Sequence, residues 1–214
     1  MAVYDLEEQE RLDALKDWWA QYRNAVYAGI GAVILAFAGV NAWRYYERNQ
    51  NEQAAALFRS VQKVAGENDA KKLSDAASAL IERFPSTFYA TEAALLAAKI
   101  SFEARDFAAA RSHLQWAADK GKAQFRPVAQ LRLATVLLEE KKYDDALKVV
   151  QGVTDEGYLP LAADLKGDIL MAQGKKDEAR VAYQLALDKA DARSPLRQFT
   201  QLKFDALGTP GEVK

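Results

Sequence analysis

The sequence contains no cysteine and a single histidine among its 214 residues. Without cysteine, the chain forms no disulfide scaffold, no thiolate nucleophile, no thiolate-bound zinc site and no iron–sulfur cluster. One histidine is too few for a metal site built from imidazole ligands or for a histidine proton relay. Thiol chemistry and histidine-based metal chemistry are therefore excluded.

The chain also lacks an excess of charge of either sign. It has 29 Lys and Arg against 30 Asp and Glu, which gives a net charge of -1. Domains that bind nucleic acid are normally basic, so we expect no nucleic-acid partner. The glycines are isolated and form no motif that cradles a phosphate. We therefore expect no cofactor and no small-molecule substrate.

The residues that could act in catalysis have structural explanations. His113 lies in a helical segment directly before the apolar packing residue Leu114, so we expect a surface or partly buried position. Two pairs of adjacent carboxylates lie at predicted helix starts or turns, where acids cap helices and favour the positive end of the dipole. These pairs are Asp144 with Asp145 and Asp155 with Glu156. The sequence therefore predicts a protein that is not an enzyme.

One long hydrophobic run is present. Residues 24–43, NAVYAGIGAVILAFAGVNAW, contain no charged side chain, and Arg23 and Arg44 border them. At about 1.5 Å per residue, a helix of about 20 residues covers the roughly 30 Å hydrocarbon core of a bilayer. Aromatic residues gather at both ends, as in helices that cross a membrane: Trp18, Trp19, Tyr22, Tyr27, Trp43, Tyr45 and Tyr46. We predict a transmembrane helix over 24–43.

The first 23 residues favour an uncleaved anchor over a signal peptide. They carry six acidic and three basic residues, unlike the short basic segment that opens a signal peptide. Apolar residues recur in them at helical intervals, which predicts an amphipathic segment over 1–23 at the membrane surface. These residues are Tyr4, Leu12, Leu15, Trp18, Trp19 and Tyr22. Three basic residues shortly before the hydrophobic run and four after it leave its orientation open.

Small residues repeat within the predicted membrane helix. Ala28, Ala32 and Ala36 follow one another at four-residue intervals. Small side chains at this spacing let a second helix approach closely. We expect this stripe to pack against another membrane helix.

Residues 50–214 predict a soluble stack of helices. Their apolar residues recur at three- and four-residue intervals, and three stretches align: 97–117, 133–153 and 166–186. Small residues occupy the packing positions, namely Ala98, Ala134 and Gly167 in the first helix of each pair and Ala110, Ala146 and Ala179 in the second. The intervals of 36 and 33 residues resemble the tetratricopeptide repeat, at about 34 residues per helix pair.

The ends of the stack are predicted from weaker signals. A degenerate copy precedes the three repeats, with helices over 55–65 and 72–85, and a helix around 195–207 would cap the far end. We therefore expect an all-α chain with one N-terminal transmembrane helix, followed by a tetratricopeptide-like solenoid of three to four helix pairs.

Stacked helix pairs form a concave groove that holds a peptide or a partner helix. The first helix of each pair lines such a groove. The candidate groove residues are Lys99, Phe102, Gln130, Arg132, Thr135 and Asp164.

The order of segments resembles a known family. An acidic stretch, EEQERLDALKDWWAQYRN (7–24), precedes a single hydrophobic run that ends in NAWRYY (41–46). The repeats follow, including RLATVLLEEKKYDDALKVV (132–150) and GYLPLAADLKGDILMAQGKKDEARVAY (157–183). Over essentially its full length, the chain resembles the YfgM family, the ancillary subunit of the SecYEG translocon of Gram-negative bacteria.

The resemblance implies an inner-membrane protein with a cytoplasmic N-terminus and a periplasmic repeat domain. It also implies two partners, the SecYEG channel and the membrane-anchored periplasmic chaperone PpiD, and a role in passing secreted proteins to PpiD and other periplasmic chaperones. Two alternatives stay open on the residues alone. One is a repeat adaptor that faces the cytoplasm and serves signalling or membrane-complex assembly. The other is a membrane-anchored hydrolase that uses paired carboxylates.

Overall fold

The computed structural model describes residues 3–67 and 69–208, and side chains for 8–67 and 69–208. Every regular element in these ranges is helical. The chain divides into two units, Met1–Asn49 and Gln50–Lys214. The longest helix, α1 (Val3–Ala65), forms the described part of the first unit and the start of the second. Of the predicted amphipathic segment, the side chain of Tyr4 lies outside the described residues.

In the first unit, the apolar side chains of α1 face outward. Val33, Leu35 and Phe37 are 69%, 74% and 72% exposed, whereas a core helix of a soluble protein would bury such residues. Asn41, a polar residue of the hydrophobic run, donates its Nδ2 hydrogen bond to the carbonyl of Phe37 at 2.8 Å, so this amide group is satisfied within the helix. Among the described residues, α1 is the one helix long and apolar enough to cross a membrane.

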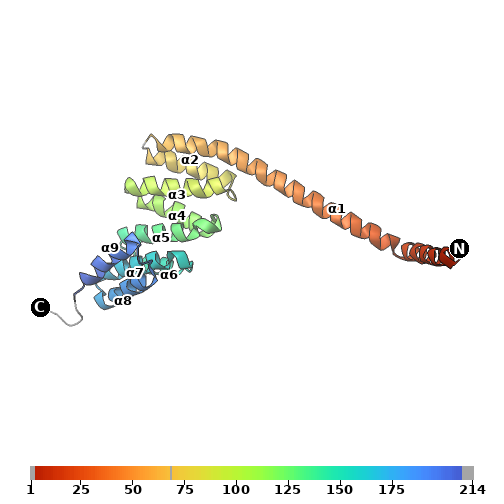
Figure 1. Cartoon of the computed structure of the whole chain (residues 1–214). Helices are drawn as coiled ribbons and strands as arrows, with labels where there is room; N and C mark the ends of the chain where they lie inside the picture. Colours follow the sequence, from red (N-terminus) through yellow and green to blue (C-terminus); the bar gives the residue numbers. More distant parts are fainter. Residues whose placement is uncertain (1–2, 68, 209–214) are drawn as a thin grey trace. The chain divides into compact units, whose positions relative to one another are not determined.

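The second unit stacks its helices in chain order (Figure 1). After the end of α1 come α2 (Ala70–Arg83), α3 (Phe88–Glu103), α4 (Phe107–Lys120), α5 (Arg126–Glu139), α6 (Tyr143–Gln151), α7 (Leu159–Ala172), α8 (Lys176–Lys189) and α9 (Pro195–Asp205). Two short 3-10 turns, η1 (Ala123–Phe125) and η2 (Glu156–Tyr158), lead into α5 and α7. From α2 to α9, each α-helix contacts the next. The prediction of an all-helical repeat fold is confirmed.

Short polar side chains fix where several of these helices begin. Asp69, Thr87, Asp106 and Ser194 each accept a hydrogen bond from a backbone N–H in the first turn of α2, α3, α4 and α9, respectively. Such caps satisfy donors that have no partner inside the helix. These four helices therefore start at positions that the sequence specifies locally.

The turn inside each of the last three pairs uses the same backbone geometry. Arg105, Lys141 and Gly174 have positive φ angles of 60°, 59° and 77°. The next residue's N–H donates to the carbonyl five positions earlier, as in Asp106 to Ser101, which closes the helix in a Schellman motif. Glycine adopts this left-handed conformation freely, and Arg and Lys adopt it at a cost.

The core lies between the two layers of each pair and between neighbouring pairs. One continuous cluster of buried side chains extends from Val61 to Ile169, and a smaller one joins α7 to α8. The alanines of the repeat pattern are all buried: Ala98, Ala110, Ala134, Ala146 and Ala179. Gly167 lies against the ring of Tyr183. Small residues stand at the close approaches of this stack, as the repeat alignment predicts.

Candidate functional site

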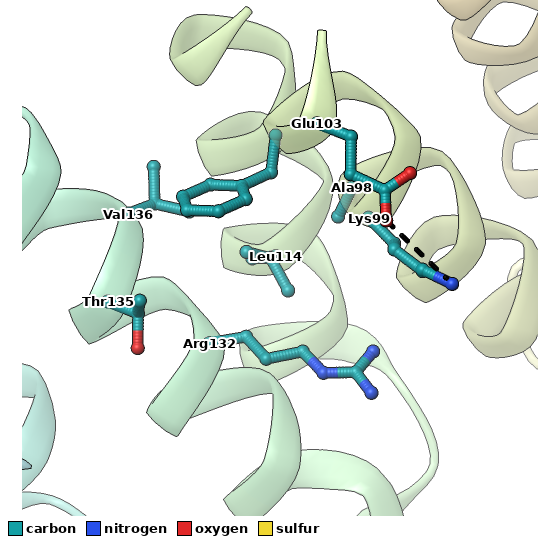
Figure 2. A pocket seen from close by; sticks show the side chains of 8 residues that line it. Ala98, Lys99, Glu103, Leu114, Arg132, Thr135 and Val136 are labelled. Atoms are coloured by element: carbon teal, nitrogen blue, oxygen red, sulfur yellow. Dashed lines mark ion pairs between the residues drawn. The ribbon is translucent and has the colours of Figure 1, made fainter. Parts of the chain in front are cut away.

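A cavity of about 290 Å³ opens between the first helices of two neighbouring pairs, α3 and α5 (Figure 2). Ala98, Lys99, Phe102 and Glu103 of α3 line one side, and Arg132, Thr135 and Val136 of α5 line the other. Leu114 of α4 completes the lining. The cavity therefore belongs to the repeat surface on which groove residues are expected.

The apolar lining follows from the helix pattern. Leu114 and Val136 are each 2% exposed and belong to the main core cluster, so the cavity reaches down to that core. Ala98 leaves room beside them, because its side chain ends at Cβ. Phe102 is half-buried, and the centroid of its ring lies 5.5 Å from that of Phe107, with the two ring planes tilted by 54°. The interior of the cavity can accept an apolar group.

The polar lining carries charges of both signs. Lys99 Nζ lies 3.8 Å from Glu103 Oε1, and the two side chains are 62% and 57% exposed. An ion pair this exposed contributes little to stability. Figure 2 shows Lys99 and Arg132 extending toward the same side of the cavity. The opening thus has two cations and one carboxylate.

The structure brings four of the six predicted groove residues together: Lys99, Phe102, Arg132 and Thr135 all line the cavity. Gln130 lies elsewhere, since a Cβ on Gly152 would stand 3.4 Å from its Nε2, next to the end of α6. Asp164 is buried and accepts hydrogen bonds from Thr200 at 2.7 Å and Lys203 at 2.7 Å, so the structure does not bring it to this cavity.

Four lining residues were not among the predicted groove positions: Ala98, Glu103, Leu114 and Val136. The repeat alignment assigned Ala98 to helix packing. Glu103 stands four residues after Lys99, and this spacing predicts an ion pair along a helix. The sequence analysis identified Leu114 only as a packing residue, and Val136 follows the small residue Ala134 by two positions. For these two, nothing in the periodicity separates the floor of a cavity from the core.

Asp164 belongs to a polar cluster that joins α7, α8 and α9. Lys203 Nζ donates to Asp164 Oδ2 and to Asp168 Oδ2, each at 2.7 Å, and the Tyr183 hydroxyl donates to Asp168 Oδ1 at 2.8 Å. Burial alone would lower the pKa of Lys203, but its hydrogen bonds with the two carboxylates raise that pKa. Burial and Asp168 also raise the pKa of Tyr183. The cluster holds the last helix on the stack.

His113 is more buried than the sequence analysis expected. It is 6% exposed, and its Nε2 lies 2.8 Å from Ser74 Oγ, so the pair links α4 to α2. Burial lowers the pKa of His113, and the negative charge of Asp106 opposes that shift. The ring sits within the repeat stack as an internal contact.

The adjacent carboxylates lie at helix starts. Asp144 and Asp145 stand in the first turn of α6, and Asp144 accepts a hydrogen bond from Gln173 at 3.0 Å. Asp155 accepts one from the backbone N–H of Gly157 at 3.0 Å, where η2 begins. Within the part of the chain that the structure describes, no three His, Asp or Glu side chains gather as a metal-ion site would require.

The small residues of α1 face outward. Ala28, Ala32 and Ala36 are exposed in the first unit. A Cβ added at the neighbouring Gly29, Gly31 or Gly39 would meet nothing within 4 Å. The packing of this stripe against a second helix stays a prediction.

The stack of helix pairs, with a cavity between the first helices of two pairs, is typical of a tetratricopeptide-like repeat protein. This chain adds an apolar N-terminal helix. Comparison with known proteins agrees, because residues 16–209 match the family described as "Tetratricopeptide repeat-like domain". Proteins called "Ancillary SecYEG translocon subunit" align over nearly their whole length. Identity is 32% for the one from Neisseria gonorrhoeae (94% of this chain, 98% of the relative) and 33% for the one from Haemophilus influenzae (86% and 90%). For the Escherichia coli protein it is 28% (97% and 99%).

The chain belongs to the family of ancillary SecYEG translocon subunits. This finding confirms the family resemblance that the order of segments in the sequence predicted. An N-terminal apolar helix also fits a single-pass protein of the inner membrane.

Proposed function

We propose that this chain is a membrane-anchored, non-catalytic scaffold of the SecYEG translocon. The observation that carries the proposal is the alignment of the Neisseria gonorrhoeae protein called "Ancillary SecYEG translocon subunit" over 94% of the chain. The apolar helix α1 supplies an anchor. The repeats supply a surface for binding protein, in the way that stacked helix pairs generally do. The histidine and the adjacent carboxylates are engaged in buried contacts and helix starts, which favours binding over catalysis.

The proposed orientation has the N-terminus in the cytoplasm and the repeat domain in the periplasm. There the domain can meet periplasmic chaperones, including the membrane-anchored PpiD, while α1 stays with the channel. Secreted chains would then pass from the channel to chaperones held nearby. A sequence without cysteine is compatible with an oxidising compartment. In this scheme the cavity lined by Lys99, Phe102, Arg132 and Thr135 is a contact for a protein partner.

The orientation is tested with single cysteines introduced at Ala2 and at Gly208 in the otherwise cysteine-free chain. A membrane-impermeant maleimide is added to cells whose outer membrane has been permeabilised. The proposal predicts that the cysteine at position 208 is labelled in these cells. The cysteine at position 2 should be labelled only after the inner membrane is opened as well. The reverse pattern would support the cytoplasmic adaptor instead.

The partners are tested by purifying the tagged full-length chain from membranes in a mild detergent and identifying what accompanies it by mass spectrometry. Recovery of SecY together with a membrane-anchored periplasmic chaperone is expected. Recovery of cytoplasmic factors alone would contradict both the orientation and the role. A partner-free preparation would also contradict the proposal.

A further inference from the structure

The cavity between α3 and α5 has the size of a side-chain pocket. An apolar cavity of about 150 Å³ in a protein core is large enough to bind benzene, and this one measures about 290 Å³. Its interior is formed by Ala98, Phe102, Leu114 and Val136. A leucine or phenylalanine side chain from another protein would find apolar contacts there on both sides, and burying it is favourable at about 25 cal/mol per Å².

The edge of the same cavity attracts an anion. Lys99 and Arg132 extend to the same side of the opening (Figure 2), and both are exposed. Within 8–67 and 69–208, the side chain of Arg132 makes no hydrogen bond or ion pair, and the one ion pair of Lys99, with Glu103, is 3.8 Å long and open to water. Both cations are thus available to a carboxylate, and the one acid in the lining offsets only half of their charge.

From these two properties we propose that the cavity binds a segment of a partner protein in which a large apolar side chain stands close to acidic side chains. The apolar side chain enters between Phe102, Leu114 and Val136, and the acidic ones lie against Lys99 and Arg132. This inference rests on the proposed function, because it specifies the chemistry of the partner that the scaffold holds at this cavity. The apolar contact supplies affinity, and the cations select against basic or neutral segments.

The test measures binding of fluorescein-labelled 12-residue peptides to the full-length chain in detergent by fluorescence anisotropy. Each peptide has one central Phe on a Gly/Ser background and two adjacent Glu residues placed one to four positions away on either side. A matched series carries Gln in place of Glu, and another carries Ser in place of Phe. At low salt, the best Glu peptide should bind about fivefold tighter than its Gln counterpart, since each exposed ion pair contributes up to about 1 kcal/mol. Salt at about 0.5 M should remove most of that difference.

The double variant Lys99→Gln/Arg132→Gln should bind the Glu and Gln peptides equally. Both side chains are exposed, so the substitutions leave the core unchanged. The control, Arg59→Gln/Lys71→Gln, removes the same charge from exposed positions on α1 and α2 and should keep the preference for Glu. Loss of the preference in the control as well would mean that net charge, and not this site, causes it.

Three further results would overturn the inference: equal binding of Glu and Gln peptides by the unmodified chain, binding that does not need Phe, or no binding at millimolar peptide. The same protein preparation is also checked for recovery of SecY. This second measurement distinguishes a failure of the inference about the cavity from a failure of the proposed translocon role. If SecY is recovered and no acidic preference is found, the pocket's chemistry is wrong and the scaffold role stands. If SecY is not recovered, the role itself fails, whatever the peptides show.

Discussion

The ring of Tyr183 occupies the space that a Cβ atom on Gly167 would need. That Cβ would stand 2.3 Å from Cε1 of Tyr183, far inside van der Waals contact. The ring cannot easily retreat, because its hydroxyl donates a 2.8 Å hydrogen bond to Asp168 on the same helix as Gly167. The absence of a side chain at one position of α7 therefore sets how closely α8 packs against it.

Replacing Gly167 with Ala should lower the free energy of unfolding of the repeat domain. Overpacking a well-filled contact costs about 1–3 kcal/mol. Urea unfolding of the full-length chain in detergent, followed by circular dichroism, measures the loss. Gly66→Ala is the control, since its Cβ would meet only the Lys63 carbonyl at 3.4 Å. An unchanged midpoint for Gly167→Ala would show that the two helices are not held at this distance.

Lys203→Met should loosen α9. It removes the cation that pairs with Asp164 and Asp168, and the Asp164 side chain is 12% exposed and has little access to water. Leaving a buried carboxylate without its charged donor costs about 1–3 kcal/mol. The rate of amide hydrogen exchange should therefore increase more in Pro195–Asp205 than in the earlier helices.

The exposed Lys189 on α8 provides the control, as Lys189→Met. That variant should exchange like the unmodified chain. Equal exchange rates in α9 for both variants would mean that apolar contacts, such as those of Phe204, hold the last helix without the polar cluster around Lys203.

Stability should fall as the pH drops below about 6.5, the ordinary pKa of histidine. Burial lowers the pKa of His113 in the folded chain, so the unfolded chain takes up a proton that the folded chain does not. Well above pH 6.5 both states are neutral at this residue, and it contributes no pH dependence there. Unfolding midpoints between about pH 7.5 and 5.5 should therefore decline less in His113→Gln than in the unmodified chain. Parallel declines would assign the pH dependence to other groups.

Lys141→Gly should stabilise the turn between α5 and α6. The residue has a φ of 59°, which a lysine adopts at a cost of about 1 kcal/mol and a glycine adopts freely. The greater freedom of glycine in the unfolded chain offsets part of the gain. A rise in the thermal midpoint by about 1 °C is expected from a net gain of a few tenths of a kcal/mol. A fall in that midpoint would contradict the left-handed turn.

The small-residue stripe of α1 gives a prediction for the membrane. Changing Ala28, Ala32 and Ala36 to Leu together should reduce recovery of SecY several-fold, because bulk on this face prevents close approach of a second helix. The matched control changes Ile30, Ile34 and Phe37 to Leu, which preserves hydrophobicity and length. Equal recovery from both triple variants would show that this stripe is not a packing face.

The periodic features of the fold could be predicted from the sequence. Ala98, Ala134 and Gly167 follow one another at intervals of 36 and 33 residues because close helix packing recurs at each repeat, so the helix pairs could be predicted from the sequence. The cavity was readable in part for the same reason. Lys99 and Arg132 lie on first helices, the layer on which we expected a groove.

Contacts between distant polar side chains could not be predicted in this way. Asp164 bonds Thr200, 36 positions further on, and His113 bonds Ser74, 39 positions earlier. Neither hydrogen bond recurs from one repeat to the next, since each occurs at one place in the stack. The sequence analysis therefore assigned Asp164 to the groove and expected His113 nearer to the surface, although both are buried.

The most direct test of the central claim is purification in the reverse direction. SecY is tagged at its chromosomal position, isolated from membranes in a mild detergent, and the amount of this chain per SecY is quantified by mass spectrometry. The translocon role predicts that the chain is enriched with SecY to a level well above abundant inner-membrane proteins of unrelated function. A preparation that contains the other channel subunits and no more of this chain than of those unrelated proteins would contradict it.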